Sequence, residues 1–326
     1  MRPFNHLNPA TLEEAAEALR QPGSVAMAGG GDLLGALKDD IAREYPKLVV
    51  NLKSIPGLDR TEVRDGALCI GALCLLGDLS RNELVLQYAP MLAEAAGKCA
   101  SPALRENSSI GGNLCQLPRC WYFRKLNNRF DCARKGGERC FALSGDNRYH
   151  SVFGPAVFEN CDGKKRACIA VNQAELAPPL MALGAEIVTT LRTLPVGEFF
   201  GVRVMSTTVL EPGELLMEIR IPLPEAGTKM RYKRFSFRKS IDFPVVNLAI
   251  VKTPENEYRV ALGGVAPMPI RAEAAEELLR GKELTPELAE AAGRAAVRDA
   301  KPTEANAYKL QLVKTLLKRE LISMMD

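Results

Sequence analysis

Residues 117 to 167 limit the fold of this 326-residue sequence more than any other segment, because they lack the apolar periodicity that marks helices and strands. A stretch of about fifty residues without regular structure inside a compact domain is usually functional or disordered. Six of the nine cysteines fall in or beside it, namely Cys115, Cys120, Cys132, Cys140, Cys161 and Cys168. Free cysteines normally behave as small buried hydrophobes, yet this segment offers little core in which to bury them. We therefore expect a metal site to order it.

The identity of the metal is less constrained than its presence. The chain has only two histidines, His6 and His150, so thiolates or carboxylates must supply most ligands. Zinc sites usually take their ligands from close C-x₂₋₄-C pairs, whereas Cys120, Cys132 and Cys140 are separated by eleven and seven residues. Iron–sulfur clusters accept wider spacings. The spacing favours a cluster slightly, and a zinc-stabilised binding module without redox function remains an alternative. A lone histidine is more often a hydrogen-bonding residue than a ligand, so His150 receives no role.

Aromatic and basic residues also gather in this segment, which raises the question of a single-stranded nucleic acid as ligand. Trp121, Tyr122 and Phe123 are followed by several arginines and lysines. The net charge of +4 is mild for this length, and no nucleic-acid fold signature accompanies the patch. We therefore expect no nucleic-acid partner.

Composition and the N-terminus restrict the compartment. No apolar run reaches the roughly 18 residues that a membrane helix needs, and the N-terminus lacks a secretion pattern. With 47% hydrophobic residues, the sequence predicts a globular chain of two or three domains without a membrane partner. An odd number of cysteines without a signal peptide favours reduced thiols over disulfides. The expected compartment is the cytoplasm.

Two glycine-rich turns interrupt the regular elements in the first third of the chain. A strand at 25–28 leads into GGGD and a helix, and the second turn, SSIGGNL, follows a helix predicted over 88–100. Further strands are expected at 47–52 and 67–76. Consecutive glycine amides can form a concave nest for phosphate oxygens. Two such nests could hold a pyrophosphate, although either turn alone could be simple punctuation.

The character of the chain changes near residue 226. A strand-like run at 214–223 is followed by Pro224, which favours a boundary there. Beyond it, three strand-like runs precede three helical patterns, at 271–280, 285–299 and 304–325. The sequence therefore predicts a larger domain over residues 1–225 and a smaller α+β domain over residues 226–326.

The glycine turns resemble those of the flavin subunits of the molybdenum hydroxylases, a family that includes xanthine dehydrogenases, carbon monoxide dehydrogenases and 4-hydroxybenzoyl-CoA reductase. The family shows an AGG-type turn after the first strand, a later S/T-I-G-G-N turn, and an S/A-D-x-x-P segment. AGGGDL, SIGGN and ELAP match these here, and the resemblance extends to LLMEIRIPLP and YKRFSFRKSIDFP. It implies an α+β fold, with a two-subdomain FAD-binding domain of the xanthine dehydrogenase/vanillyl-alcohol-oxidase type and a small C-terminal α+β domain.

This resemblance implies FAD-binding roles at individual positions. In the two turns they are Ala28, Gly29, Gly30, Gly31, Asp32, Leu33, Ser109, Ile110, Gly111, Gly112 and Asn113. Glu175 stands where the family usually has aspartate, and Leu216 and Lys233 match positions near the flavin. A cation at Lys233 would stabilise the anionic reduced flavin. The other basic residues of that strand are expected to form a solvated edge.

The 4-hydroxybenzoyl-CoA reductase type of this family carries an insertion after the I-G-G-N turn that binds a four-iron four-sulfur (4Fe-4S) cluster. The insertion here, about 117–168, starts at the same place. By resemblance, the implied ligands are Cys120, Cys132, Cys140 and Cys168. Cys161 is the substitute candidate, and Cys115 is expected to pack beside the flavin turn. Residues 119–140 hold seven arginines and lysines against two acids, which would offset the negative charge of a cluster.

These features imply an FAD-binding electron-transfer subunit of a heterotrimeric molybdenum hydroxylase. The resemblance implies a large subunit with the molybdenum cofactor and the substrate site, and a small subunit with 2Fe-2S clusters. We therefore expect no catalytic acid, base or nucleophile on this chain. A ferredoxin would suit reductive chemistry of the 4-hydroxybenzoyl-CoA reductase kind. The alternative is the flavin subunit of a xanthine or aldehyde dehydrogenase that uses NAD.

Overall fold

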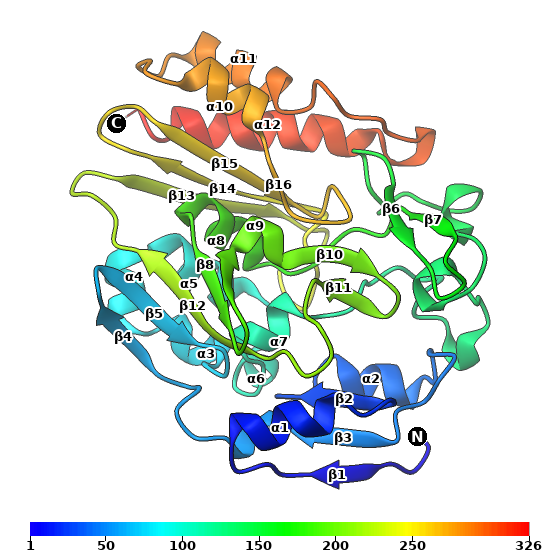
Figure 1. The fold of residues 1–326 in the computed structure, drawn as a ribbon. Helices are drawn as coiled ribbons and strands as arrows, with labels where there is room; N and C mark the ends of the chain where they lie inside the picture. Colours follow the sequence, from blue (N-terminus) through cyan, green and yellow to red (C-terminus); the bar gives the residue numbers. More distant parts are fainter. Residues whose placement is uncertain (326) are drawn as a thin grey trace.

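The computed structural model describes residues 1–325, which form a two-lobed N-terminal part and a C-terminal sheet covered by helices (Figure 1). The first lobe is a three-stranded parallel sheet in the order β1-β3-β2. Its elements are β1 (Asn5–Leu7), α1 (Leu12–Leu19), β2 (Ser24–Met27), α2 (Leu33–Lys38), β3 (Leu48–Asn51) and the 3₁₀ turn η1 (Leu52–Ser54). Thr11 caps α1, because its hydroxyl accepts a hydrogen bond from the Glu14 amide at 3.2 Å.

The second lobe is built on a five-stranded antiparallel sheet in the order β4-β5-β12-β8-β9. Its strands are β4 (Thr61–Arg64), β5 (Ala67–Gly71), β8 (Glu186–Thr189), β9 (Thr193–Pro195) and β12 (Leu216–Pro222), and a hairpin of β10 (Phe200–Arg203) and β11 (Ser206–Thr208) lies beside it. Its helices are α3 (Leu76–Leu79), α4 (Glu83–Tyr88), α5 (Pro90–Lys98), α6 (Pro102–Arg105), α7 (Ile110–Leu114), α8 (Ala177–Leu183) and α9 (Val196–Phe199). Ile219 and Ile221 alternate with polar residues along β12, so this strand turns one apolar face to the main core.

The insertion between α7 and α8 is more ordered than its sequence predicts. It contains three 3₁₀ turns, η2 (Leu126–Asn128), η3 (Ala133–Lys135) and η4 (Phe141–Leu143), and the hairpin of β6 (Ala156–Glu159) and β7 (Lys165–Cys168). It also contributes to two small cores: Phe123 and Cys132 pack with Ile41 of the first lobe, and Phe158 packs with Cys168. The expectation of a segment without regular structure or core was therefore wrong, because isolated aromatic residues supply apolar surface that no periodicity reveals.

The C-terminal part is a four-stranded sheet in the order β13-β14-β15-β16. Its elements are β13 (Lys229–Phe235), β14 (Val246–Lys252), β15 (Tyr258–Gly263), β16 (Ile270–Arg271), α10 (Glu273–Leu279), α11 (Pro286–Ala295), η5 (Glu304–Asn306) and α12 (Tyr308–Ile322). Helices α10 and α12 cover one face, whereas α5 and α8 of the second lobe pack on the other (Figure 1). Tyr232, Val251 and Ala261 thus belong to the same core as the second lobe.

Most predicted elements are present, with shorter bounds. The strand predicted over 67–76 ends at Gly71, because the chain turns there and the Cys74 amide donates to the Gly71 carbonyl at 3.0 Å. The helix predicted over 88–100 begins at Pro90 and ends at Lys98. No helix described within residues 1–325 has the length and apolar character needed to cross a membrane.

Candidate functional site

The first glycine turn connects β2 to α2 and lies against the chain that leads into the second turn. The Asn107 side chain donates to the Gly29 carbonyl at 2.7 Å, and a Cβ on Gly29 would lie 1.8 Å from the Asn107 carbonyl oxygen. Gly30 has a φ of +73°, a left-handed conformation that favours glycine. The structure therefore brings the two predicted turns side by side.

The first turn offers a run of unused backbone donors. Within the part of the chain that the structure describes, none of the five N–H groups from Gly29 to Leu33 donates to a protein acceptor. Such consecutive amides form a concave, partly positive surface that suits an anion. The Asp32 carboxylate is not directed to this surface, since it accepts from the Leu117 amide at 2.8 Å and pairs with Arg119 and Arg124 at 2.8 and 2.6 Å.

The second turn uses its donors within the protein. The Ile110 amide donates to the Cys74 carbonyl at 2.9 Å, and the Gly111 amide to the Ala72 carbonyl at 2.8 Å. The Gly112 amide donates to the Ser109 hydroxyl at 3.1 Å. Of the five amides from Ser109 to Asn113, only that of Ser109 has no acceptor among the described residues, so the second turn offers fewer free donors than the first. Whether both turns bind a pyrophosphate stays a prediction.

The second turn instead supports its neighbours by close packing. A Cβ on Gly111 would lie 2.8 Å from the Ala72 carbonyl and 3.4 Å from Leu216, so Leu216 lies directly beside this turn. The Asn113 side chain accepts from the Leu176 amide at 3.3 Å, which ties the turn to the segment that carries Glu175. Three of the separately predicted parts of the site are thus contiguous.

Glu175 is buried, with 4% of its surface exposed, and its carboxylate is committed to protein partners. It accepts from the Tyr232 hydroxyl at 2.5 Å and from the Arg234 guanidinium at 2.8 Å. Burial raises the pKa of Glu175 and also raises the pKa of Tyr232. The hydrogen bond to a flavin nucleotide that the resemblance implies for Glu175 stays a prediction.

Lys233 is paired with a residue of the C-terminal part. Its ammonium is 3.5 Å from the Glu320 carboxylate on α12. Successive strand residues point to opposite faces, so Arg234 and Tyr232 face α5 and α8 while Lys233 faces the helices of the C-terminal part. Sequence reasoning singled out Lys233 and missed Arg234. The alternation in KMRYKRF was the available signal, because it places Arg234 on the same face as the apolar ring of Tyr232.

The four cysteines predicted as ligands converge. A small cavity in the insertion is lined by Cys120, Cys132, Cys140 and Cys168, together with aromatic and alanine side chains. Cys161 is exposed and does not line this cavity, while Cys115 packs against the main core and its burial raises the pKa of its thiol to about 12. The convergence agrees with the ligand set implied by the resemblance, although the ligation itself stays a prediction.

The thiols in this cavity differ in their acidity. A hydrogen bond from Cys168 lowers the pKa of Cys140 to about 6, and the same contact raises the pKa of Cys168. Burial raises the pKa of Cys120 to about 12. Among the described residues, no three histidine, cysteine or acidic side chains are close enough to hold a single metal ion.

Two buried cations lie beside the cysteines. Arg134 and Lys135 on η3 are 4% and 2% exposed, and neither is paired with a carboxylate in the described chain. Arg134 donates to the Ser206 carbonyl at 2.7 Å and Lys135 to the Phe123 carbonyl at 3.2 Å. Burial lowers the pKa of both groups. Buried charges are normally compensated. Arg134 lines the cysteine-lined cavity, whereas Lys135 does not line it and is attracted by the charge of Asp131.

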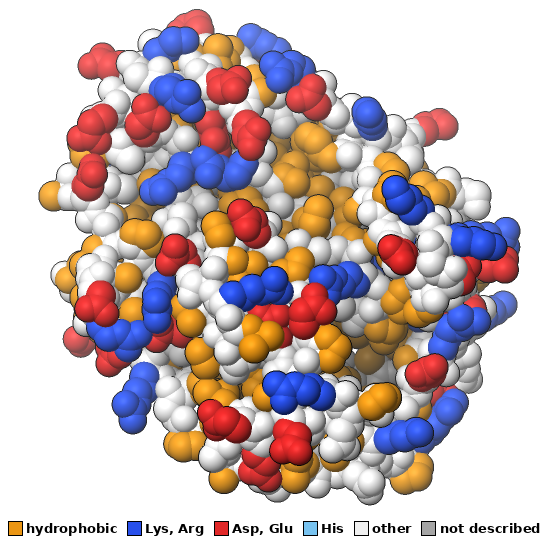
Figure 2. Space-filling model, in the orientation of Figure 1, with side chains coloured by type: hydrophobic (Ala, Val, Ile, Leu, Met, Phe, Trp, Pro, Cys, Tyr) orange, Lys and Arg blue, Asp and Glu red, His pale blue; other side chains and the backbone are white. Residues whose placement is uncertain are grey.

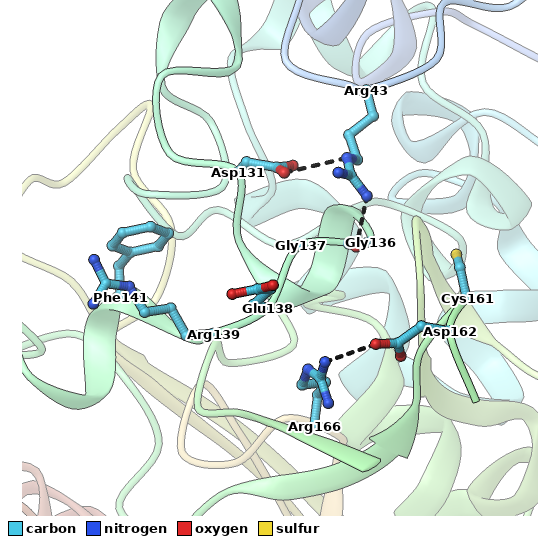
Figure 3. A pocket seen from close by; sticks show the side chains of 10 residues that line it. All are labelled: Arg43, Asp131, Gly136, Gly137, Glu138, Arg139, Phe141, Cys161, Asp162 and Arg166. Carbon is cyan, nitrogen blue, oxygen red and sulfur yellow. Dashed lines mark hydrogen bonds and ion pairs between the residues drawn. The ribbon is translucent and has the colours of Figure 1, made fainter. Parts of the chain in front are cut away.

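A second, open cavity lies on the surface of the insertion (Figure 3). Arg43 pairs there with Asp131 at 3.2 Å, and Arg166 pairs with Asp162 at 2.8 Å. Phe141 lines both this cavity and the cysteine-lined one. Figure 2 shows Lys and Arg side chains, with some Asp and Glu side chains among them, on the visible face of the insertion.

Together, the parallel lobe with its turn of free amides, the antiparallel second lobe and the C-terminal α+β sheet define a two-lobed flavoprotein. A family model described as the FAD binding domain in molybdopterin dehydrogenase matches residues 2–224, and one described as the CO dehydrogenase flavoprotein C-terminal domain matches residues 231–324. The chain therefore belongs to the family of FAD-binding medium subunits of the molybdenum hydroxylases.

Known proteins match along nearly the whole chain. The aldehyde oxidoreductase FAD-binding subunit PaoB of Escherichia coli (strain K12) is 35% identical over 97% of this chain and 96% of its own length. The carbon monoxide dehydrogenase medium chain of Hydrogenophaga pseudoflava is 28% identical over 98% of this chain and 96% of its own. A structure of carbon monoxide dehydrogenase from the same organism superposes with a TM-score of 0.73 at 26% identity, covering 98% of this chain and 96% of the matched chain.

Proposed function

We propose that this chain is the FAD-binding electron-transfer subunit of a molybdenum hydroxylase complex and that its insertion holds a 4Fe-4S cluster. The observation that carries the cluster is the convergence of four cysteines on one cavity beside two buried cations. When bound, these groups would supply one-electron and two-electron transfer between the cluster, FAD and the 2Fe-2S clusters of a partner subunit.

In the proposed FAD site, the free amides from Gly29 to Leu33 bind the pyrophosphate. The second turn, Ser109 to Asn113, supports the first through close packing rather than through its own amides. Leu216 lies beside it, and Glu175 holds Arg234 and Tyr232 in place. The flavin-edge role of Lys233 rests on the family resemblance alone.

In the proposed cluster site, Cys120, Cys132, Cys140 and Cys168 are the thiolate ligands. Arg134 and Lys135 balance the negative charge that four thiolates bring into a buried place. Zinc bound to four thiolates would also carry a negative charge that these two cations could balance. The identity of the metal must therefore be measured. Zinc without iron or flavin would leave a zinc-stabilised binding module as the remaining function.

The partners we propose are a large subunit with the molybdenum cofactor and a small subunit with 2Fe-2S clusters. The 35% identity to an aldehyde oxidoreductase FAD-binding subunit favours the oxidation of an aldehyde as the second candidate, with NAD as acceptor, beside 4-hydroxybenzoyl-CoA reductase-like chemistry with ferredoxin. Turnover assays of the purified complex, with an aldehyde and NAD in one and with 4-hydroxybenzoyl-CoA and reduced ferredoxin in the other, distinguish these two functions. The cytoplasmic location stays a prediction.

The deciding experiment is anaerobic purification followed by measurement of FAD, iron, sulfide and zinc per chain. We expect FAD and about four irons per chain in the unaltered protein. Cys132→Ser should lose most of the iron and keep FAD, whereas Cys161→Ser, a matched change of an exposed cysteine in the same insertion, should keep both. Full iron in Cys132→Ser would refute the ligand set, and iron loss in Cys161→Ser would make Cys161 a ligand.

A further inference from the structure

His150 lies against one of the proposed ligands. Its Nε2 atom is 3.2 Å from the Cys120 sulfur, and its ring meets the Trp121 ring edge to face at a centroid distance of 5.7 Å. The residue is 3% exposed. Its other nitrogen, Nδ1, is buried and has no hydrogen-bond partner among the described residues. The imidazole is therefore fixed by packing and by one polar contact, to sulfur.

The direction of that hydrogen bond follows from the sulfur. A thiolate that binds a metal has no proton to donate, so it can only accept. Nε2 must then carry the hydrogen, which leaves Nδ1 without one.

The C-terminal part of the chain holds the backbone on which His150 sits. The Lys309 ammonium, at the start of α12, donates to the carbonyls of Tyr149, His150 and Gly264 at 2.8, 3.1 and 2.8 Å. Asn306 adds a hydrogen bond to the Ser151 carbonyl at 3.0 Å. Figure 1 shows the beginning of α12 next to the insertion. Lys309 is 1% exposed, so water does not compete for these contacts.

We infer that His150 donates a hydrogen bond from Nε2 to the Cys120 sulfur and that Lys309 holds it in that position from the C-terminal domain. Both are positioning residues, and the inference rests on the cluster proposed above. A donor to a ligand sulfur stabilises the more negative, reduced form of the group bound there. The contact therefore raises the reduction potential, and Lys309 tunes that potential through the position of His150.

Three variants of two residues test this on the anaerobically purified protein, with iron and sulfide per chain and a spectroscopic redox titration as readouts. His150→Leu should keep its iron and lose the donor, with a drop in potential equivalent to about a tenfold change in the reduction equilibrium, ~59 mV for one electron. His150→Gln can still donate and should recover at least half of that drop. An unchanged potential in His150→Leu with full iron would overturn the inference.

Lys309→Met should lower the potential by a smaller amount at full iron content, because the carbonyls of Tyr149 and His150 lose the donor that ties them to Gly264. Lys314→Met on the same helix is the matched control and should change nothing. Equal potentials in Lys309→Met and the control would remove Lys309 from the inference. Iron loss in both His150 variants would overturn the positioning role and make His150 a ligand. Absence of iron from the unaltered protein would instead refute the proposed cluster itself.

Discussion

At the scale of single residues, two glycine turns that look alike in sequence have different roles. Both place consecutive glycines after a regular element, but the amides of Gly111 and Gly112 are used inside the protein, while those of Gly30 and Gly31 are free. The difference arises from distant residues such as Ala72, which supply acceptors to one turn only. No local pattern contains that information. The sequence could therefore locate the two turns but could not show which of them has amides free to bind an anion.

Gly31→Asp should weaken FAD binding without harming the fold. A Cβ at Gly31 would meet only the Ser108 hydroxyl at 3.7 Å, so the side chain fits, but its carboxylate would repel a pyrophosphate on the adjacent amides. We expect the FAD dissociation constant to rise at least about tenfold, or ~1.4 kcal/mol. Gly35→Asp on α2, where a Cβ meets nothing within 4 Å, is the control. Equal FAD affinity in the two variants, measured by fluorescence titration, would contradict the placement.

Glu175 allows a second test at this scale, because its charge compensates a buried arginine. Glu175→Gln should leave Arg234, whose side chain is 9% exposed, without a counter-charge. We expect a loss of about 3 kcal/mol in the free energy of unfolding. Glu290→Gln, which breaks exposed pairs with Arg294 and Lys318, should cost less than about 1 kcal/mol. Urea denaturation compares the two, and a similar cost for both would show that the buried pair is not structural.

The same variant addresses the role that the family resemblance implies for Glu175. FAD per folded chain should fall in Glu175→Gln if the carboxylate bonds to the flavin nucleotide. It should stay unchanged if the carboxylate serves only Arg234 and Tyr232. Glu290→Gln again supplies the baseline, since it changes a carboxylate far from the glycine turns by the same chemistry.

At the scale of elements, η3 concentrates the charge that a cluster would need. It places Lys135 in a buried position where its ammonium has one carbonyl partner, the Phe123 oxygen. Lys135→Met should therefore stabilise the metal-free protein by about 1 kcal/mol, because an uncompensated buried charge is removed. The same change should weaken iron retention in the loaded protein, because four thiolates then lose a counter-charge.

The prediction is specific because Lys135→Met should stabilise the metal-free protein and yet weaken iron retention in the loaded protein. Lys125→Met, in the exposed part of the same insertion, should alter neither quantity. Thermal unfolding of the metal-free forms and the rate of iron loss to a chelator provide the two measurements. A destabilised metal-free Lys135→Met protein would mean that the ammonium is compensated by the protein itself, and the argument for an anionic group in the cavity would fail.

The elements also show how far sequence reasoning reaches. Helices with clear periodicity, such as α11 and α12, were predicted close to their bounds because their burial pattern repeats every turn. The regular elements of the insertion were not predicted, because its order comes from a few aromatic side chains and from contacts with remote segments. The four converging cysteines were indicated by resemblance, whereas His150 was left without a role and Arg234 was missed, since their contacts depend on which atoms the fold places opposite them.

At the scale of the whole molecule, the predicted boundary at residue 225 divides the chain but not its core. Tyr232, Val251 and Ala261 of the C-terminal sheet pack in the same core as the second lobe. Lys309 and Asn306 reach from the C-terminal part to the insertion. Two parts that share a core and a network of buried hydrogen bonds should not unfold independently.

We therefore expect residues 1–225 expressed alone to be unstable, because α5 and α8 would expose the apolar face that the C-terminal sheet covers. The full chain should unfold in urea as one transition, with the same midpoint by far-ultraviolet circular dichroism and by fluorescence of Trp121, its only tryptophan. Co-expression of residues 1–225 with residues 226–326 should restore a soluble complex, because the shared core can form between two chains. Two separate transitions in the full chain, or a stable fragment 1–225, would show that the lobes and the C-terminal sheet are independent domains after all.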